Sequence, residues 1–173
     1  MPGGRVGDTF ASFDLRRNPE MRPAHDRCVA VAEGREWCAL LSGGYGNGKS
    51  HLAIAAMRAY GWDRSYFWKV PDFLAWLRER AFGDGPEKTP IDALLRSYRE
   101  ADFLLVLDDL GAENATDWAA EQLYRVLDSR YDAKLPTVIT SNVAPDKIDA
   151  RIRSRFRAGL VVCKGRDVRA VSA

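Results

Sequence analysis

The segment Gly43–Ser50 constrains the fold of this chain more than any other. It reads Gly-Gly-Tyr-Gly-Asn-Gly-Lys-Ser, which is the complete pattern G-x-x-x-x-G-K-S. Half of its positions are glycine, so the backbone can wrap around an anion without Cβ clashes and direct its N–H groups inward. An apolar run at 38–42 precedes the segment, and a helical pattern at 51–58 follows it. This order of strand, loop and helix predicts a phosphate-binding loop.

The residues of this loop have predicted roles toward a nucleoside triphosphate, which we expect to be ATP with Mg²⁺. Lys49 would reach the β- and γ-phosphates, and the Ser50 hydroxyl would hold Mg²⁺. The other nucleotide-binding candidates in and beside the loop are Gly43, Gly44, Tyr45, Gly46, Asn47, Gly48 and His51. The alternative is a glycine-rich turn that matches by chance, and the flanking strand and helix patterns disfavour it.

A second motif is the apolar run at 103–109, Phe-Leu-Leu-Val-Leu-Asp-Asp, which ends in two carboxylates. This pattern is typical of a Walker B strand. Asp108 would orient Mg²⁺ or its waters, and Asp109 would orient or deprotonate an attacking water. A strand that simply ends in a polar turn is the alternative, and a doubled Asp downstream of a complete phosphate loop disfavours it.

Polar residues follow the next predicted strand. Asn142 ends the run Thr-Ser-Asn and could hydrogen-bond both the γ-phosphate and the water, or could act as a turn residue that caps the strand. Arg151, Arg153 and Arg155 come next, and the first and last share a helix face because they are four residues apart. A planar, bidentate arginine suits a transition-state phosphate, and one acting in trans requires an oligomer. Contact with a phosphate backbone and surface ion pairs remain open alternatives.

The pattern along the chain alternates strands with helices of about three turns. Besides 38–42, strands are predicted at 65–70, 102–108, 137–141 and 160–163, and helices at 23–33, 71–82, 90–100, 116–131 and 145–156. Residues 1–8 are expected to be a flexible lead, and 83–89 a polar, mobile loop. This alternation predicts an α/β fold with a parallel sheet covered by helices on both faces. Ligands of such sheets bind at the carboxyl ends of the strands, where the motifs lie.

Length and composition add limits. A chain of 173 residues is expected to form one domain. No apolar run approaches a membrane span, and no signal peptide is visible, so no membrane contact is expected. The three cysteines are odd in number and scattered, which favours reduced thiols and a cytoplasmic location. The net charge is +2, but 146–169 is strongly basic, as expected for an anionic partner, for arginines directed at nucleotide, or for a solvated face.

The ordered set of motifs resembles the AAA+ ATPases of the DnaC/DnaI helicase-loader type. The motifs are the phosphate loop, Asp-Asp-Leu-Gly from 108, Thr-Ser-Asn from 140, Arg-Ile-Arg-Ser-Arg from 151 and Gly-Arg-Asp-Val-Arg from 165. The resemblance implies a P-loop NTPase of the ASCE class with a five-stranded parallel sheet and a reduced or absent lid. It also implies that Asn142 is sensor 1, Arg155 the arginine finger and Arg169 the sensor 2 arginine. Thr9, Phe10 and Phe13 would line an adenine pocket or, alternatively, pack in the core.

This resemblance implies ATP hydrolysis, slow without a partner, by a domain that covers residues 1–173. It further implies ATP-dependent homo-oligomers, binding of single-stranded DNA and action on a replicative helicase in DNA replication. The loaders usually carry a helicase-binding domain before the ATPase core, and here we expect it to be absent. The aromatic strand at 66–69 and the loop at 83–89 are candidate DNA contacts, although a buried strand explains the aromatic residues equally well.

Three other functions stay open. The first is an IstB-type transposition helper that binds duplex DNA and a transposase, and it shares the Asp-Asp-Leu-Gly and Thr-Ser signatures. The second is a P-loop kinase or nucleotide switch without DNA, which the position of the arginines after Thr-Ser-Asn disfavours. The third is a binding module that uses ATP only to clamp an assembly, with negligible turnover.

Overall fold

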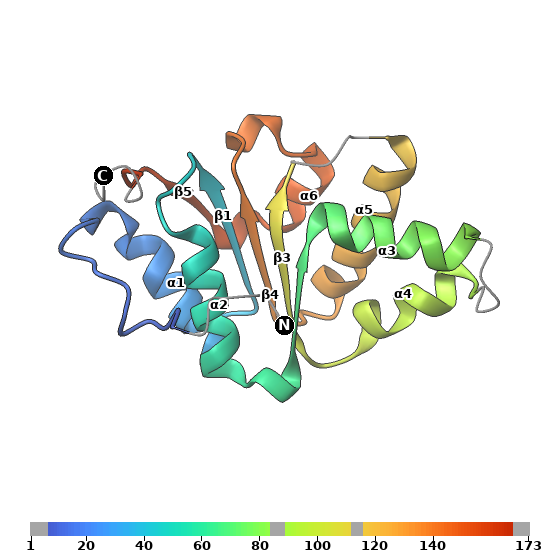
Figure 1. Cartoon of the computed structure of the whole chain (residues 1–173), viewed down its shortest axis with the longest axis horizontal. Helices are drawn as coiled ribbons and strands as arrows, with labels where there is room; N and C mark the ends of the chain where they lie inside the picture. Colours follow the sequence, from blue (N-terminus) through green and yellow to red (C-terminus); the bar gives the residue numbers. More distant parts are fainter. Residues whose placement is uncertain (1–6, 84–88, 112–115, 168–173) are drawn as a thin grey trace.

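The structure is a computed structural model that describes residues 7–83, 89–111 and 116–167. Within these ranges, five parallel strands form one sheet in the order β2-β3-β4-β1-β5. The strands are β1 (Cys38–Gly43), β2 (Ser65–Lys69), β3 (Leu104–Leu110), β4 (Thr137–Ser141) and β5 (Leu160–Cys163). Because β3, β4 and β1 are parallel neighbours, their carboxyl ends lie side by side at one end of the sheet (Figure 1).

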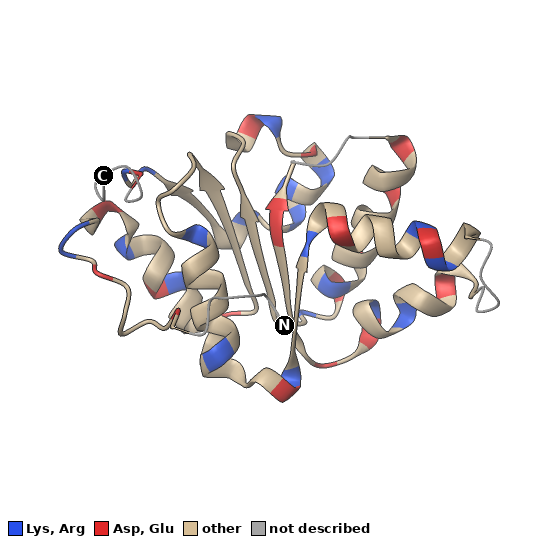
Figure 2. Ribbon diagram, in the orientation of Figure 1, with Lys and Arg blue, Asp and Glu red and all other residues tan. Residues whose placement is uncertain are grey.

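Helices cover both faces of the sheet. On one face lie α1 (Arg22–Ala32) and α2 (Lys49–Tyr60), and on the other lie α3 (Val70–Phe82), α4 (Ile91–Glu100), α5 (Asp117–Asp132) and α6 (Ala150–Arg155) (Figure 1). Successive strand residues point to opposite faces, so Leu40 joins the core under α3–α6 while Ala39 and Leu41 join the core under α1 and α2. The central strands β1 and β4 contain no charged residue (Figure 2). The predicted α/β architecture is confirmed.

One predicted helix was wrong. The pattern at 145–156 predicted a continuous helix, but the structure has a short 3₁₀ turn, η3 (Pro145–Lys147), followed by a separate α6. Ile148 is extended, and the Asp149 carboxylate accepts hydrogen bonds from the backbone N–H groups of Arg151 (2.8 Å) and Ile152 (3.3 Å). An Asp side chain that satisfies these N–H groups starts a new helix more favourably than it continues an old one. Similar 3₁₀ turns are η1 (Pro19–Met21), η2 (Trp62–Arg64) and η4 (Arg157–Gly159).

A fully buried arginine joins the sheet to α4 and α5 at the edge away from the motifs. The Arg130 guanidinium donates to Thr137 Oγ1 (3.0 Å) and to the carbonyl oxygens of Tyr98 (2.9 Å), Phe103 (2.6 Å) and Pro136 (2.8 Å). Burial lowers the pKa of Arg130 to about 10, so the group still carries its charge at neutral pH. Its partners lie on α4 and at the starts of β3 and β4, so this buried cation serves the fold.

We expect Arg130→Met to lower the free energy of unfolding by about 3–5 kcal/mol, because it removes the charged donor from the buried carbonyl oxygens of Tyr98 and Phe103. The matched control is Arg125→Met on the same helix, where a partly exposed guanidinium pairs with Asp92. That change should cost no more than about 1 kcal/mol. Urea unfolding followed by circular dichroism measures both values, and equal values for the two variants would contradict the structural role of Arg130.

Candidate nucleotide-binding site

A cavity of about 370 Å³ lies where the central strands end. Its lining comes from the phosphate loop, the ends of β2 and β3, the segment after β4 and one residue of the N-terminal segment. The lining residues are Asp8, Tyr45, Gly46, Asn47, Gly48, Lys49, Ser50, His51, Lys69, Asp108, Asp109 and Asn142. The two motifs that are about 60 residues apart in sequence therefore face one space, which is the arrangement predicted for a nucleotide site.

Two glycines of the phosphate loop have backbone conformations that exclude other residues. Gly46 and Gly48 have φ angles of 73° and 97°, in the left-handed region. A Cβ on Gly48 would lie 2.5 Å from the ring of Phe13, and a Cβ on Gly46 would overlap the carboxylate of Asp167. The loop can therefore follow its path only because these positions lack side chains.

The ammonium group of Lys49 lies inside the loop. Its Nζ donates to the carbonyl oxygens of Gly43 (2.8 Å) and Gly44 (2.6 Å) and to Asn47 Oδ1 (3.1 Å). The residue is nearly buried, with 4% of its surface exposed. The first turn of α2 thus places a cation among backbone groups of the loop, where an anion would meet it.

Two asparagines connect the loop to its surroundings. Asn18 is buried, and its Nδ2 donates to the carbonyl oxygen of Asn47 (3.2 Å) and to that of Arg166 (3.5 Å). The Nδ2 of Asn47 donates in turn to the carbonyl oxygen of Cys163 at the end of β5 (3.3 Å). These hydrogen bonds hold the loop against both the N-terminal segment and the end of the sheet. The hydrogen bonds of these two asparagine side chains were not predicted, because they join segments that are distant in sequence.

Ser50 and Asp108 form a direct hydrogen bond. Ser50 Oγ donates to Asp108 Oδ1 at 2.8 Å, and Thr140 Oγ1 donates to the same oxygen at 2.6 Å. Hydroxyl and carboxylate oxygens are the donors that Mg²⁺ prefers, so this pair fits the predicted metal-holding residues. Thr140 is a residue that sequence analysis did not single out, although it lies in the Thr-Ser-Asn run that drew attention to Asn142.

The second carboxylate of the pair reaches the same cavity because of an irregularity in the strand. In a regular strand, adjacent side chains point to opposite faces. Here the pairing of β3 with β4 shifts between Leu107 and Leu110, and Asp109 has a left-handed φ of 63°. Its backbone N–H donates to Thr140 Oγ1 (3.0 Å), and its Oδ1 accepts from Asn142 Nδ2 (2.6 Å). Strained backbone of this kind is common at functional sites, where it directs a side chain.

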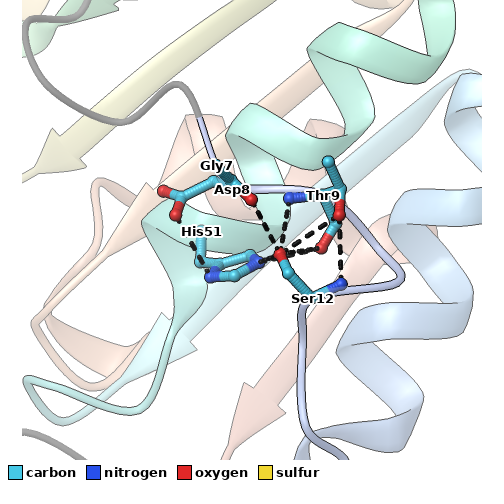
Figure 3. Close-up of polar contacts among 5 residues, drawn as sticks. All are labelled: Gly7, Asp8, Thr9, Ser12 and His51. Atoms are coloured by element: carbon cyan, nitrogen blue, oxygen red, sulfur yellow. Dashed lines mark hydrogen bonds and ion pairs between the residues drawn. The ribbon is translucent and has the colours of Figure 1, made fainter.

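The N-terminal segment is fastened to the first turn of α2 through His51 (Figure 3). The Nε2 of His51 lies 2.9 Å from the carbonyl oxygen of Thr9 and 3.2 Å from Ser12 Oγ, and its Nδ1 lies 3.4 Å from Asp8 Oδ1. Ser12 Oγ also donates to the carbonyl oxygen of Gly7 (2.9 Å). Asp8 and His51 both line the cavity, so this segment forms part of its wall.

The two phenylalanines predicted for an adenine pocket lie just behind this wall. Phe13 packs edge-on against His51, with ring centroids 5.2 Å apart, and Phe10 packs edge-on against His25 at 5.3 Å. Both rings rest on the core beneath α1 and α2. Neither is among the described residues that line the cavity, so direct contact with a base stays a prediction.

Arg151, Arg153 and Arg155 are not among the described residues that line this cavity. Arg155 pairs with Asp128 of α5 at 2.7 Å, and Arg151 contacts Glu121 and Asp149 at 3.6 and 3.3 Å. Part of the basic C-terminal region is thus paired with acidic groups of its own chain. Arg169 falls outside the described residues, so its predicted sensor role stays a prediction.

Two further residues line the cavity without having been predicted to do so. Asp8 comes from the segment expected to be a flexible lead, and Lys69 was considered only as a DNA contact. Lys69 pairs in register with Asp108, a relation that appears only once β2 and β3 are neighbours. Trp68, also a candidate DNA contact, instead donates to Tyr98 Oη (3.2 Å) and packs against Trp76. The loop at 84–88 lies outside the described residues.

Three other features of the ranges that the structure describes bear on function: clusters of metal ligands, cysteine thiols and the length and polarity of the helices. No cluster of three or more His, Cys, Asp or Glu residues there could hold a metal ion by itself, so Ser50 and Asp108 would need phosphate oxygens and waters to complete a coordination shell. The three cysteines are free and buried, and burial raises the pKa of Cys163 to about 11, which keeps that thiol neutral. None of the helices described is long and apolar enough to cross a membrane.

Fold and site together define a P-loop nucleotide-binding domain of the AAA+ type. The chain belongs to the family of IstB-like ATP binding proteins, whose profile matches residues 8–154. The chain is 32% identical over 167 residues to the chromosomal replication initiator protein DnaA of Rippkaea orientalis, an alignment that covers 88% of this chain and 34% of DnaA. The chain thus spans about a third of the length of that relative.

Two solved structures share the fold. Replication initiator DnaA bound to AMPPCP and single-stranded DNA superposes with a TM-score of 0.74 and 23% identity, over 90% of this chain and 49% of DnaA. The DnaC helicase loader superposes with a TM-score of 0.72 and 23% identity, over 92% of this chain and 98% of the loader structure. The predicted resemblance to the loaders is confirmed at the level of fold and family, and the relation to DnaA is an addition that the motifs did not suggest.

Proposed function

We propose that this domain binds and hydrolyses ATP with Mg²⁺ and acts as the ATPase module of a helicase-loader-type protein in DNA replication. The observation that carries the proposal is the convergence of Lys49, Ser50, Asp108, Asp109 and Asn142 on one cavity. Membership of a family of ATP binding proteins supports the proposal that the bound nucleotide is ATP. Glycine backbone, a cation, metal-holding oxygens and a second carboxylate are groups that phosphoryl transfer to water uses.

In this proposal each residue has a separate task. Lys49 leaves the carbonyl oxygens of the loop and binds the β- and γ-phosphate oxygens. Ser50 and Asp108 hold Mg²⁺, which when bound neutralises charge on the phosphates. Asp109 accepts a proton from the attacking water, and Asn142, which donates to its carboxylate, fixes the direction of that carboxylate and of the water. Thr140 keeps Asp108 in place through its 2.6 Å hydrogen bond.

The site is proposed to be completed by a neighbouring copy of the chain. Arg155 lies on α6 with 40% of its side chain exposed, and it is not among the described residues of its own cavity. A guanidinium in this position can serve as an arginine finger only for a different nucleotide. Assembly and hydrolysis are therefore expected to depend on each other. Arg169 is proposed as the sensor 2 arginine on the resemblance alone.

The proposed partners are single-stranded DNA and, through a longer protein, a replicative helicase. The solved DnaA complex with AMPPCP and single-stranded DNA supports the DNA partner, because it has the same fold. The superposition on nearly the whole structure of the DnaC helicase loader supports a helicase as the second partner. We propose a cytoplasmic location, consistent with three free, buried cysteines.

We expect a non-hydrolysable ATP analogue to promote both self-association and binding to oligo-dT. Sedimentation velocity measures the first, and fluorescence anisotropy of labelled oligo-dT measures the second, each with ADP as the control. Neutralisation of three or four phosphates would lower the DNA affinity roughly 10-fold or more between about 50 and 200 mM salt. Identical behaviour with ADP and with the analogue would contradict the proposal.

A second candidate is an IstB-type transposition helper that binds duplex DNA, and the family match to IstB-like proteins favours it. The anisotropy experiment separates the two when an oligo-dT and a duplex of equal length compete. Preference for the duplex would favour the transposition helper. Self-association with the analogue but negligible ATP turnover, even with DNA, would favour a nucleotide-clamped binding module.

A further inference from the structure

Four residues of α5 form a continuous stripe that faces α6, and we call them the α5 stripe. They are Glu121, Tyr124, Asp128 and Tyr131, spaced three, four and three residues apart, which places them on one face of the helix. Arg151 and Arg155, four residues apart on α6, lie along this stripe. The two helices pack against each other (Figure 1).

Arg155 is held by three members of the α5 stripe. Its Nε donates to Asp128 Oδ1 at 2.7 Å, and its Nη2 lies 3.5 Å from the hydroxyl of Tyr124. The guanidinium also lies over the ring of Tyr131, 5.1 Å from its centroid. A carboxylate on the Nε side and an aromatic face beneath fix both the tilt and the rotation of the planar group.

Arg151 is engaged differently. It lies over the ring of Tyr124 at 4.3 Å and contacts carboxylates from two sides, Glu121 at 3.6 Å and Asp149 at 3.3 Å. Arg155, in contrast, has one carboxylate partner, and among the described residues no hydrogen bond uses its Nη1. Of these two arginines, Arg155 is therefore the one whose outer edge is available to a phosphate.

We propose that Asp128 is a positioning residue for Arg155, which it holds by Nε so that the Nη edge points at the γ-phosphate of the neighbouring subunit. This inference rests on the proposed function, in which Arg155 acts in trans. A long, partly exposed arginine samples many rotamers, and only a few of them reach a phosphate. Holding it in one of these before assembly increases the fraction of encounters that lead to hydrolysis.

Two features agree with a persistent ion pair. The Asp128 side chain is less exposed than that of Arg155, with 28% against 40% of its surface accessible to solvent. Asp128 can therefore hold the inner side of the guanidinium while the outer side stays open to a neighbouring subunit. The pKa of Asp128 is lowered, mainly by the hydrogen bond from Arg155. An ion pair at the surface contributes little to the free energy of unfolding. The stability of the fold therefore does not by itself explain why Asp128 lies beside Arg155.

The test is a double-mutant cycle in the full chain, with ATP turnover measured in the presence of oligo-dT. Asp128→Asn is expected to lower kcat about 10-fold while leaving the Kd for ATP and the melting temperature nearly unchanged. The same change in an Arg155→Ala background should cause no further loss, because nothing remains to be positioned. Asp132→Asn, an exposed carboxylate on the same helix outside the α5 stripe, is the matched control and should behave as wild type.

Several results would overturn this inference. Unchanged kcat in Asp128→Asn would show that Arg155 needs no positioning, and increased kcat would show that Asp128 competes with the phosphate. An equal loss with and without Arg155 would reveal a general structural effect. Should Asp128→Asn fail to fold, Tyr131→Leu removes the ring beneath the guanidinium and should lower kcat in the same non-additive way. Full turnover in the single variant Arg155→Ala would instead show that Arg155 is not an arginine finger. That result contradicts the proposed function itself, and it is distinguishable from a failure of the role of Asp128.

Discussion

Lys49→Ala is expected to abolish ATP binding. Lys49 is the one cation at the centre of the phosphate loop, held there by Gly43, Gly44 and Asn47. Two charge-assisted hydrogen bonds to phosphate oxygens contribute about 1.5–3 kcal/mol each, so their loss should raise the Kd by roughly 100-fold or more. Isothermal titration calorimetry with ATP and Mg²⁺ measures this directly.

The control for this prediction is Lys147→Ala, which removes an equal charge from an exposed position in η3. It should leave the Kd for ATP unchanged. Lys49→Met provides a second variant that keeps the apolar stem in its nearly buried position and removes only the ammonium. An unaltered Kd in either Lys49 variant, in a protein that melts at the wild-type temperature, would refute the assignment of the cavity as the nucleotide site.

Arg155→Ala is expected to lower kcat by roughly 10³-fold or more while the Kd for ATP stays within a factor of about three. The reason is that an arginine finger stabilises charge that develops only in the transition state. The side chain lies outside its own cavity, so ground-state binding should hardly depend on it. Single-turnover kinetics under conditions of assembly separate the chemical step from nucleotide binding.

Mixing experiments then ask whether the arginine acts across subunits. Lys49→Ala subunits retain Arg155 but cannot bind ATP, and Arg155→Ala subunits retain the cavity but lack the finger. If the arginine acts in trans, a mixture of the two inactive variants should regain turnover. A mixture as inactive as its components, or full loss of activity in a protein that stays monomeric, would contradict action in trans.

Much of the fold could be predicted because its signals are local. The glycine pattern of 43–50 is typical of a loop between a strand and a helix, and the short apolar runs before it and at 103–107 are typical of buried strands. The helix at 145–156 was predicted wrongly because a period of 3.6 residues does not reveal that the Asp149 side chain caps a new helix. There a single side chain, which accepts two hydrogen bonds from the backbone, outweighed the apolar pattern.

By itself, the sequence determined which chemical groups this protein supplies to the candidate nucleotide site. The glycines, Lys49 and Ser50 belong to one short motif, and the paired carboxylates belong to another. Each motif can be recognised because its residues are close together in the sequence. Tertiary structure alone decided how these groups meet: the strand order that sets Lys69 beside Asp108, the bulge that turns Asp109 into the cavity, and the α5 stripe beneath Arg155. These features join residues far apart in sequence, so their geometry depends on how the strands and helices pack and not on any local pattern.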